Sequence, residues 1–268
     1  RILNVSDTAG SENSFPREEY SFPPPGRFEG DWRKWGFGHV IVGFLASFLA
    51  AALAFKLVES ANSQDIEDLY ELPMWGISVV TLSQQLVLIA IVIIASRFFG
   101  ESLRKDFLLQ ARPRDSFKGL SLGIAAQFIL VPATTYPFIW LFNIDPDRIS
   151  EPAKELSDKA TSPLGVGALV LTVAVLAPVS EELFYRGLLY GAIRKRFKVA
   201  QSEALTKWFP IIVSSLIFSA VHFELLLFPA LFVVGMVFAL IYERSQRLAL
   251  AIWAHVGFNA TTLFSLLV

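Results

Sequence analysis

The sequence predicts an all-α protein: a polytopic bundle of about seven transmembrane helices preceded by a polar arm. Hydrophobic residues make up 54% of the 268 residues and charged residues only 18%. A soluble domain of this size could not bury so much apolar surface. Apolar segments recur along the chain, most of them long enough to cross a bilayer. Lys and Arg residues gather in every second connection between these segments, which is the pattern of an integral membrane protein.

The chain divides into two parts in this prediction. Residues 1–34 are polar and include three consecutive prolines, Pro23 to Pro25, so we expect a disordered or extended arm. Residues 35–268 form the transmembrane helical domain. The chain begins at Arg1 rather than Met, so a processed or incomplete chain is expected. The absence of cysteine excludes disulfides and thiolate metal sites, and the net charge of −1 carries no indication of nucleic-acid binding.

Seven apolar segments are the expected spans. In order, their approximate ranges are 37–55, 74–96, 119–142, 164–190, 208–222, 228–242 and 248–268. The fifth and sixth are short for a bilayer that needs about 20 residues. They are either two helices or one unit broken at 223–229, where Glu224 and Pro229 interrupt the apolar pattern.

Loop charges support this count and predict an orientation. With Arg186 set aside inside a span, the alternate connections carry 18 and 4 Lys or Arg residues. The positive-inside rule then places the amino terminus in the cytoplasm and the carboxyl terminus outside. A bacterial plasma membrane is the simplest setting, although a plastid membrane obeys the same rule. The acidic connections 56–73 and 143–162 face outward in this scheme and are predicted to be solvated linkers.

Small residues recur at helical spacing. Gly119 with Gly123, and Gly187 with Gly191, form GxxxG pairs. Such pairs let helices approach closely in lipid. We expect them to allow close packing around the fourth span.

The fourth span carries three ionisable residues within six positions, Glu181, Glu182 and Arg186. Each charge at membrane depth costs about 2.5–3.5 kcal/mol on insertion scales, so these groups need internal partners. Glu182 and Arg186 are four residues apart, share a helix face and can pair. Glu181 lies about 100° around the helix and is less compensated, so it can serve as a general base toward water. A purely structural ion cluster is the alternative.

Two later spans place polar groups at the same membrane depth. His222 follows Phe218 by four residues, and His255 and Asn259 are four apart on one helix face. Alone, His222 is typical of a hydrogen-bonded packing residue. The His255 and Asn259 pair fits interhelical hydrogen bonding as well as oxyanion stabilisation. Together the three helices favour a chemical site, whereas His39 is predicted to be an interfacial residue.

Three motifs in this order resemble those of the CPBP family, which includes the type II CAAX-prenyl proteases, also called Rce1-like or Abi proteins. They lie within residues 178–259 and read Glu181-Glu182-x-x-x-Arg186, Phe218-x-x-x-His222 and His255-x-x-x-Asn259. The resemblance implies an all-helical intramembrane endopeptidase of glutamate type that acts on a membrane-associated peptide or protein.

The resemblance also implies roles for these residues. Glu181, assisted by His222, activates a water for attack on the scissile amide. His255 and Asn259 steady the tetrahedral oxyanion. The remaining motif residues, Glu182, Arg186 and Phe218, support the site. We expect no metal cofactor, with zinc as the alternative.

Other interpretations stay open. Glu181, His222 and His255 can be read as a zinc set, since three N/O ligands plus water suit catalytic zinc, although no HExxH helix is present. A non-catalytic module, such as an immunity factor or a subunit of a larger membrane complex, would use the cluster as a lock or a pocket, and residues 1–34 for docking. A transporter is disfavoured because the sequence shows no inverted repeat.

One geometric difficulty accompanies the enzyme interpretation. If the fourth span ends near residue 190, Glu181 lies toward its cytoplasmic half. His222 lies about 14 residues into the fifth span, which is about 21 Å of rise. Contact between them then requires a start deeper than Trp208, a tilt, or a kink at Pro178.

Overall fold

The structure of the protein is a computed structural model that describes residues 34–62, 66, 68–197 and 202–267. These residues form helices and connections, with no strand among them. The α-helices are α1 Phe37–Asn62, α2 Met74–Phe99, α3 Leu103–Asp106, α4 Asp115–Ala125, α5 Val131–Phe142, α6 Asp147–Asp158, α7 Pro163–Leu169, α8 Ala177–Glu181, α9 Tyr190–Arg196, α10 Glu203–Ala220, α11 Phe228–Ser245 and α12 Leu248–Leu267. A 3₁₀ turn, η1 Leu69–Glu71, precedes α2.

Three wider π-helical segments join some of these helices without a break. They are η2 Ala126–Leu130, η3 Val170–Leu176 and η4 Glu182–Leu189. As a result α4, η2 and α5 form one continuous helix, and the elements from α7 to α9 form another of 34 residues. π-Segments are rare and frequent at functional sites.

The predicted all-α polytopic fold is confirmed. Among the described residues, six helices are long and apolar enough to cross a membrane, and α10 is a shorter apolar helix. The fifth and sixth apolar segments are separate helices, α10 and α11. The fourth span runs on to Arg196 rather than ending near residue 190. The arm predicted for residues 1–34 lies outside the described residues, apart from Lys34.

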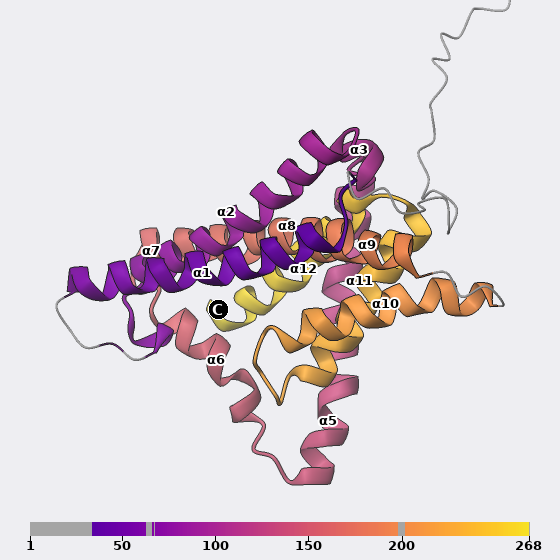
Figure 1. Ribbon diagram of the computed structural model, residues 1–268. Coiled ribbons are helices and arrows are strands. Elements are labelled where there is room, and N and C mark those ends of the chain that lie inside the picture. The colour runs from indigo at the N-terminus through magenta and orange to yellow at the C-terminus, as the bar shows by residue number, and fades with distance from the viewer. Residues whose placement is uncertain (1–33, 63–65, 67, 198–201, 268) are drawn as a thin grey trace, which may run out of the picture.

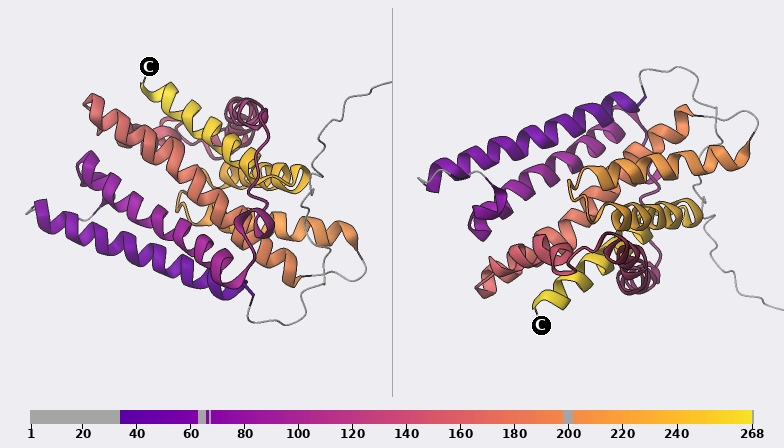
Figure 2. Two further views of the ribbon diagram at one scale, coloured as in Figure 1. Left: turned by 90° about the horizontal axis from the view of Figure 1, so that it is seen from above. Right: turned by 90° about the horizontal axis from the view of Figure 1, so that it is seen from below.

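The long helix 163–196 lies at the centre of the bundle. Figures 1 and 2 show it between the paired helices α1 and α2 on one side and α12 on the other. Every residue from Glu182 to Ile193 is buried, whereas the outer helices expose large apolar side chains to the surroundings. Charged groups within a membrane protein are tolerated where the bundle surrounds them, and this stretch supplies such a place.

Glycines bring α4 and α12 into backbone contact. A Cβ added at Gly119 would lie 2.4 Å from Trp253 Cβ, and one at Gly123 would lie 1.9 Å from the carbonyl oxygen of Ala254. The first predicted glycine pair is therefore a helix–helix seam. The second pair is different, because Gly187 and Gly191 face the side chains of Phe107 and Trp35, which lie outside the long helices.

The seam gives a first prediction. Gly123→Ala is expected to destabilise the protein by about 1–3 kcal/mol or more, because backbone atoms of α12 cannot yield as a side chain does. Gly167→Ala in α7 is the matched control, since a Cβ there meets nothing within 4 Å. Unfolding in mixed detergent micelles measures both. Equal stabilities of the two variants would contradict a tight α4–α12 seam.

Polar clusters tie together the basic ends of the helices. The buried Asp115 accepts from Arg247 Nε at 2.9 Å, joining the start of α4 to the turn between α11 and α12. Arg194 pairs with Glu243 at 2.9 Å, joining α9 to α11. The sequence showed these residues only as loop or span-end charges, because their partners lie far along the chain.

The acidic connection 143–162 is not a plain linker. Figure 1 shows that it contains α6, which runs from the far end of α5 back toward α7. Ile149, Ala153 and Leu156 are partly buried, whereas Glu151 and Lys154 between them are exposed. This is the spacing of an amphipathic helix, so the expectation of a solvated linker was wrong for this segment.

Candidate active site

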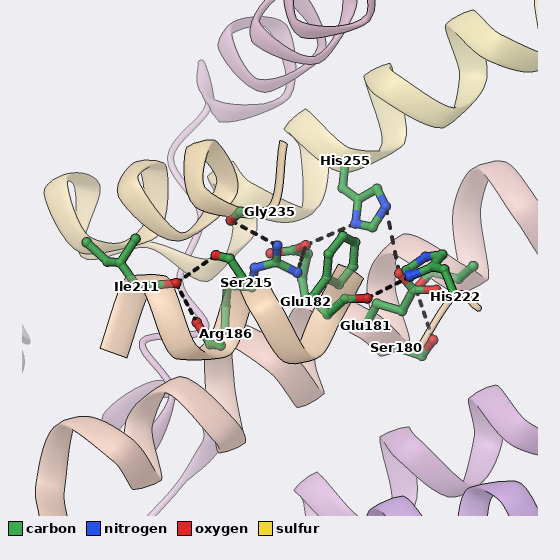
Figure 3. A network of polar contacts seen from close by, with 12 residues as sticks. Ser180, Glu181, Glu182, Arg186, Ile211, Ser215, His222, Gly235 and His255 are labelled. Atoms are coloured by element: carbon green, nitrogen blue, oxygen red, sulfur yellow. Dashed lines mark hydrogen bonds and ion pairs between the residues drawn. The ribbon is translucent and has the colours of Figure 1, made fainter. Parts of the chain in front are cut away.

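A buried ion pair lies in the middle of the central helix (Figure 3). Arg186 Nη1 is 2.8 Å from Glu182 Oε1, and the two side chains are 1% and 0% exposed. Arg186 Nη2 also donates to the carbonyl oxygen of Gly235 in α11 at 3.1 Å. The guanidinium lies over the ring of Phe218, 4.3 Å from its centroid. The buried charge of Arg186 therefore has partners from the central helix, from α10 and from α11.

The same glutamate orients His255. The Nδ1 atom of His255 donates to Glu182 Oε1 at 2.9 Å. Because a carboxylate only accepts, Nδ1 carries a proton and Nε2 is the free edge of the ring. Nε2 faces Glu181, 3.8 Å from its Oε2. Glu182 therefore links Arg186 on one side to His255 on the other.

The Glu181 side chain points away from the ion pair of Glu182 and Arg186. Its side chain is 22% exposed and lines the cavity described below, whereas Glu182 is fully enclosed. Adjacent residues of a helix point about 100° apart, which accounts for the different surroundings of two identical side chains. Figure 3 shows Glu181 and His222 on the same side of the network.

His222 is placed by the end of α10. Its Nδ1 donates to the carbonyl oxygen of Phe218 at 2.7 Å, which leaves Nε2 as the acceptor in the neutral ring. Phe223, the next residue, has a φ of 57° and ends the helix in the left-handed region. Ser219 Oγ donates to the carbonyl oxygen of Phe228 at 2.7 Å and fixes this corner against α11. The ring of His222 is therefore held by local contacts.

A cavity of about 290 Å³ brings the candidate residues together. Glu181, His222, His255 and Asn259 all line it, and Phe218 contributes to its wall. Most of the remaining lining is apolar. A few convergent polar groups in an apolar pocket are the usual form of a binding site.

The length of the central helix reduces the difficulty over depth. Because the helix continues to Arg196, Glu181 lies 15 residues from its basic end, which is about 22 Å at 1.5 Å per residue. His222 lies 19 residues after Glu203, where α10 begins, which is about 28 Å at 1.5 Å per residue. The two depths counted from the basic side therefore differ by about 6 Å. A deeper start of α10 does not contribute, because α10 begins earlier than expected.

The Asn259 side chain donates a hydrogen bond to the carbonyl oxygen of Val173. This carbonyl lacks a backbone donor because residue 178 is proline. In η3 the Ala177 N–H binds the carbonyl of Thr172, five residues back. In the same register Val173 would need the N–H of residue 178, which is proline and has none. Asn259 Nδ2 donates to Val173 O at 2.8 Å instead. One of its two amide protons is therefore committed, and the other can reach into the cavity.

This contact gives a second prediction. Asn259→Leu is expected to cost about 1–3 kcal/mol, because the Val173 carbonyl loses its donor inside the bundle. The same change in a Pro178→Ala background is expected to cost less, because alanine at that position supplies the missing backbone N–H. A double-mutant cycle on unfolding in detergent measures the difference. Fully additive effects would contradict the link between Pro178 and Asn259.

The side chains that could be read as a zinc set are Glu181, His222 and His255. In the part of the chain that the structure describes, no three His, Cys, Asp or Glu side chains are grouped so as to hold a metal ion. Glu181, His222 and His255 line one cavity without forming such a group.

Sequence reasoning missed some contributors to the site. Ala153 and Leu156 of α6 line the cavity, and their spacing within an acidic connection was the available signal. Gly235, which accepts from Arg186, carried no local signal.

Fold and site together define a class: a polytopic helical membrane protein with a buried carboxylate–imidazole cluster beside a largely apolar cavity. Residues 163–261 match the family described as type II CAAX prenyl endopeptidase Rce1-like. This segment contains all three motifs, and the resemblance to that family is confirmed over its length. No solved structure matches the chain.

Two curated relatives align with the chain over 97 residues each. One is the "Uncharacterized 24.3 kDa protein" of Escherichia coli, 34% identical over 35% of this chain and 41% of that protein. The other is the "Putative membrane peptidase YdiL" of Bacillus subtilis, 30% identical over 35% of this chain and 35% of that protein. The chain thus spans less than half the length of the curated relatives it matches.

Proposed function

We propose that the protein is an intramembrane endopeptidase that hydrolyses a peptide bond of a membrane-associated substrate without a metal ion. One observation carries the proposal. A carboxylate, Glu181, and the unprotonated edge of an imidazole, His222, line one apolar cavity inside a membrane bundle. An enclosed water held between two such acceptors is in the setting that general-base catalysis needs.

The mechanism follows from these groups. Glu181 accepts a proton from the water as its oxygen attacks the carbonyl carbon, and His222 Nε2 accepts the second hydrogen bond of that water and orients it. The tetrahedral intermediate then collapses with cleavage of the C–N bond. Glu181 returns its proton to the leaving amine, so the sum is one water consumed for each bond hydrolysed.

The oxyanion requires donors, and two residues can supply them. Asn259 retains one amide proton beyond the one given to Val173. His255 already donates through Nδ1 to Glu182, so it can donate through Nε2 only as an imidazolium. Glu182 is therefore a positioning residue that holds the His255 ring through its Nδ1–H. Such donors are worth about 2.7–4 kcal/mol each where they have been removed from hydrolases.

We further propose a bacterial plasma membrane, with the amino terminus in the cytoplasm and the carboxyl terminus outside, on the charge of the connections. A second candidate is a non-catalytic membrane module, either an immunity factor or a subunit of a larger complex. It draws on the fact that the His222 and Asn259 side chains each bind a backbone carbonyl, as structural residues do.

The deciding experiment compares protein amino termini in a strain carrying the wild-type gene and in one carrying Glu181→Gln. New termini within membrane proteins that disappear in the Glu181→Gln strain would identify the substrate. A strain carrying Glu181→Gln with His222→Ala that keeps full biological function would instead favour the non-catalytic module. Elemental analysis showing one zinc per purified chain would overturn the metal-free mechanism.

A further inference from the structure

The outer wall of the cavity is formed by α6. Ala153 and Leu156 on its inner face line the same cavity as Glu181 and His222. No residue of α6 is fully buried, and Glu151, on the opposite face, is exposed. The helix thus rests on the bundle by one narrow stripe, and two residues of that stripe form part of the cavity wall.

The cavity extends away from the basic ends of the helices. Its lining includes His222 just after α10, Leu231 near the start of α11 and Thr262 near the end of α12. All three positions lie at the helix ends opposite the Lys- and Arg-rich connections. Toward the basic side the buried stretch Glu182–Ile193 and the buried Phe238 fill the interior.

Other outer connections gather near α6. Burial raises the pKa of Tyr70, which lies in η1, and the carboxylates of Glu224 and Glu155 raise it further. The connection before α2 also contacts α6 directly, because Leu156 packs against the apolar cluster that contains Ile66 and Leu72. This contact lies at the end of the bundle toward which the cavity extends.

We propose that the substrate reaches Glu181 from the extracytoplasmic side, past α6, and that Ala153 and Leu156 contact the residue next to the scissile bond. The inference rests on the proposed function and names the substrate: an unwound, apolar stretch near the outer end of a membrane protein's span. The size of the cavity supports this. At about 290 Å³ it is near the lower limit of ligand pockets, and a helix of about 10 Å diameter cannot enter.

The first test locates α6, using the absence of cysteine from the chain. Three single-cysteine variants are treated with a membrane-impermeant maleimide in spheroplasts. Ala153→Cys and Glu151→Cys are expected to react from outside, and Arg114→Cys, exposed in a basic connection, only after lysis. Labelling of Arg114→Cys from outside, or of the α6 cysteines only after lysis, would overturn the proposed side of entry.

The second test asks whether α6 contacts substrate, using the cleavage identified with Glu181→Gln. Ala153→Trp is expected to lower kcat/KM by about tenfold or more because it fills the cavity. Glu151→Trp, on the outer face of the same helix, is expected to stay within about twofold. Labelling the folded Ala153→Cys protein is expected to block cleavage as well, which guards against a folding defect in the tryptophan variant.

The outcomes separate the two proposals. Loss of cleavage in Glu181→Gln with wild-type rates in both Ala153→Trp and the labelled Ala153→Cys protein would refute the role of α6 and leave the protease intact. Identical sets of amino termini in the wild-type and Glu181→Gln strains would refute the proposed protease itself. New termini at the cytoplasmic ends of substrate spans would overturn extracytoplasmic entry.

Discussion

Arg186→Met is expected to destabilise the protein by about 3–5 kcal/mol, the cost of leaving one member of a buried ion pair without its partner. Glu182 is fully enclosed, and after the substitution its carboxylate keeps the contact with His255 but loses the guanidinium. The substitution also removes the hydrogen bond to the carbonyl oxygen of Gly235 and the stacking of the guanidinium on Phe218. Reversible unfolding in mixed detergent micelles measures the loss.

Two further variants show whether the loss comes from the charge. Arg186→Met combined with Glu182→Gln removes both charges and is expected to recover part of the stability. Lys56→Met removes an exposed partner of Glu59, and such pairs contribute about 0–1 kcal/mol. If Arg186→Met were as mild as Lys56→Met, the buried pair would not be the anchor of the central helix.

Glu181→Gln is expected to lower kcat by about 10²–10⁴-fold, the usual contribution of a general base. Its stability is expected to remain that of the wild type, because glutamine fills the same space and Glu181 is not part of the Arg186 ion pair. Glu182→Gln provides the contrast. It is expected to lose activity and stability together, since it removes the partner of both Arg186 and His255.

Purified enzyme and the substrate found in the strain comparison supply both measurements. His222→Ala is expected to follow Glu181→Gln, with low turnover and near-native unfolding. Wild-type turnover in Glu181→Gln would remove the general base from the mechanism. A large loss of stability in that variant would instead indicate that Glu181 serves the fold.

Local spacing made part of the site predictable. Glu182 and Arg186 are four residues apart on one helix and pair, and His222 binds the carbonyl of Phe218 four residues before it. The apolar spans and the alternation of basic connections were equally visible, because burial in lipid and interfacial charge act on each segment separately. These features depend on neighbours within one turn or one span.

The partners between helices were not predictable in this way. His255 binds Glu182 across 73 positions, and Asn259 binds Val173 across 86. Which face of α12 meets the central helix depends on π-segments, on Pro178 and on the close approach of α4. These features change the rotation and the membrane depth of each helix by amounts that cannot be read from the sequence of one segment.

The order of residues alone was enough to predict a helical membrane protein with acid, imidazole and amide groups within three of its apolar segments. The reason is that a bilayer penalises each exposed polar group segment by segment. The three-dimensional arrangement was needed to show that the central helix reaches Arg196, that Glu181 and His222 line one cavity, and that α6 contributes to its wall. Those outcomes depend on how helices of unequal length pack against one another, which is a property of the assembled bundle.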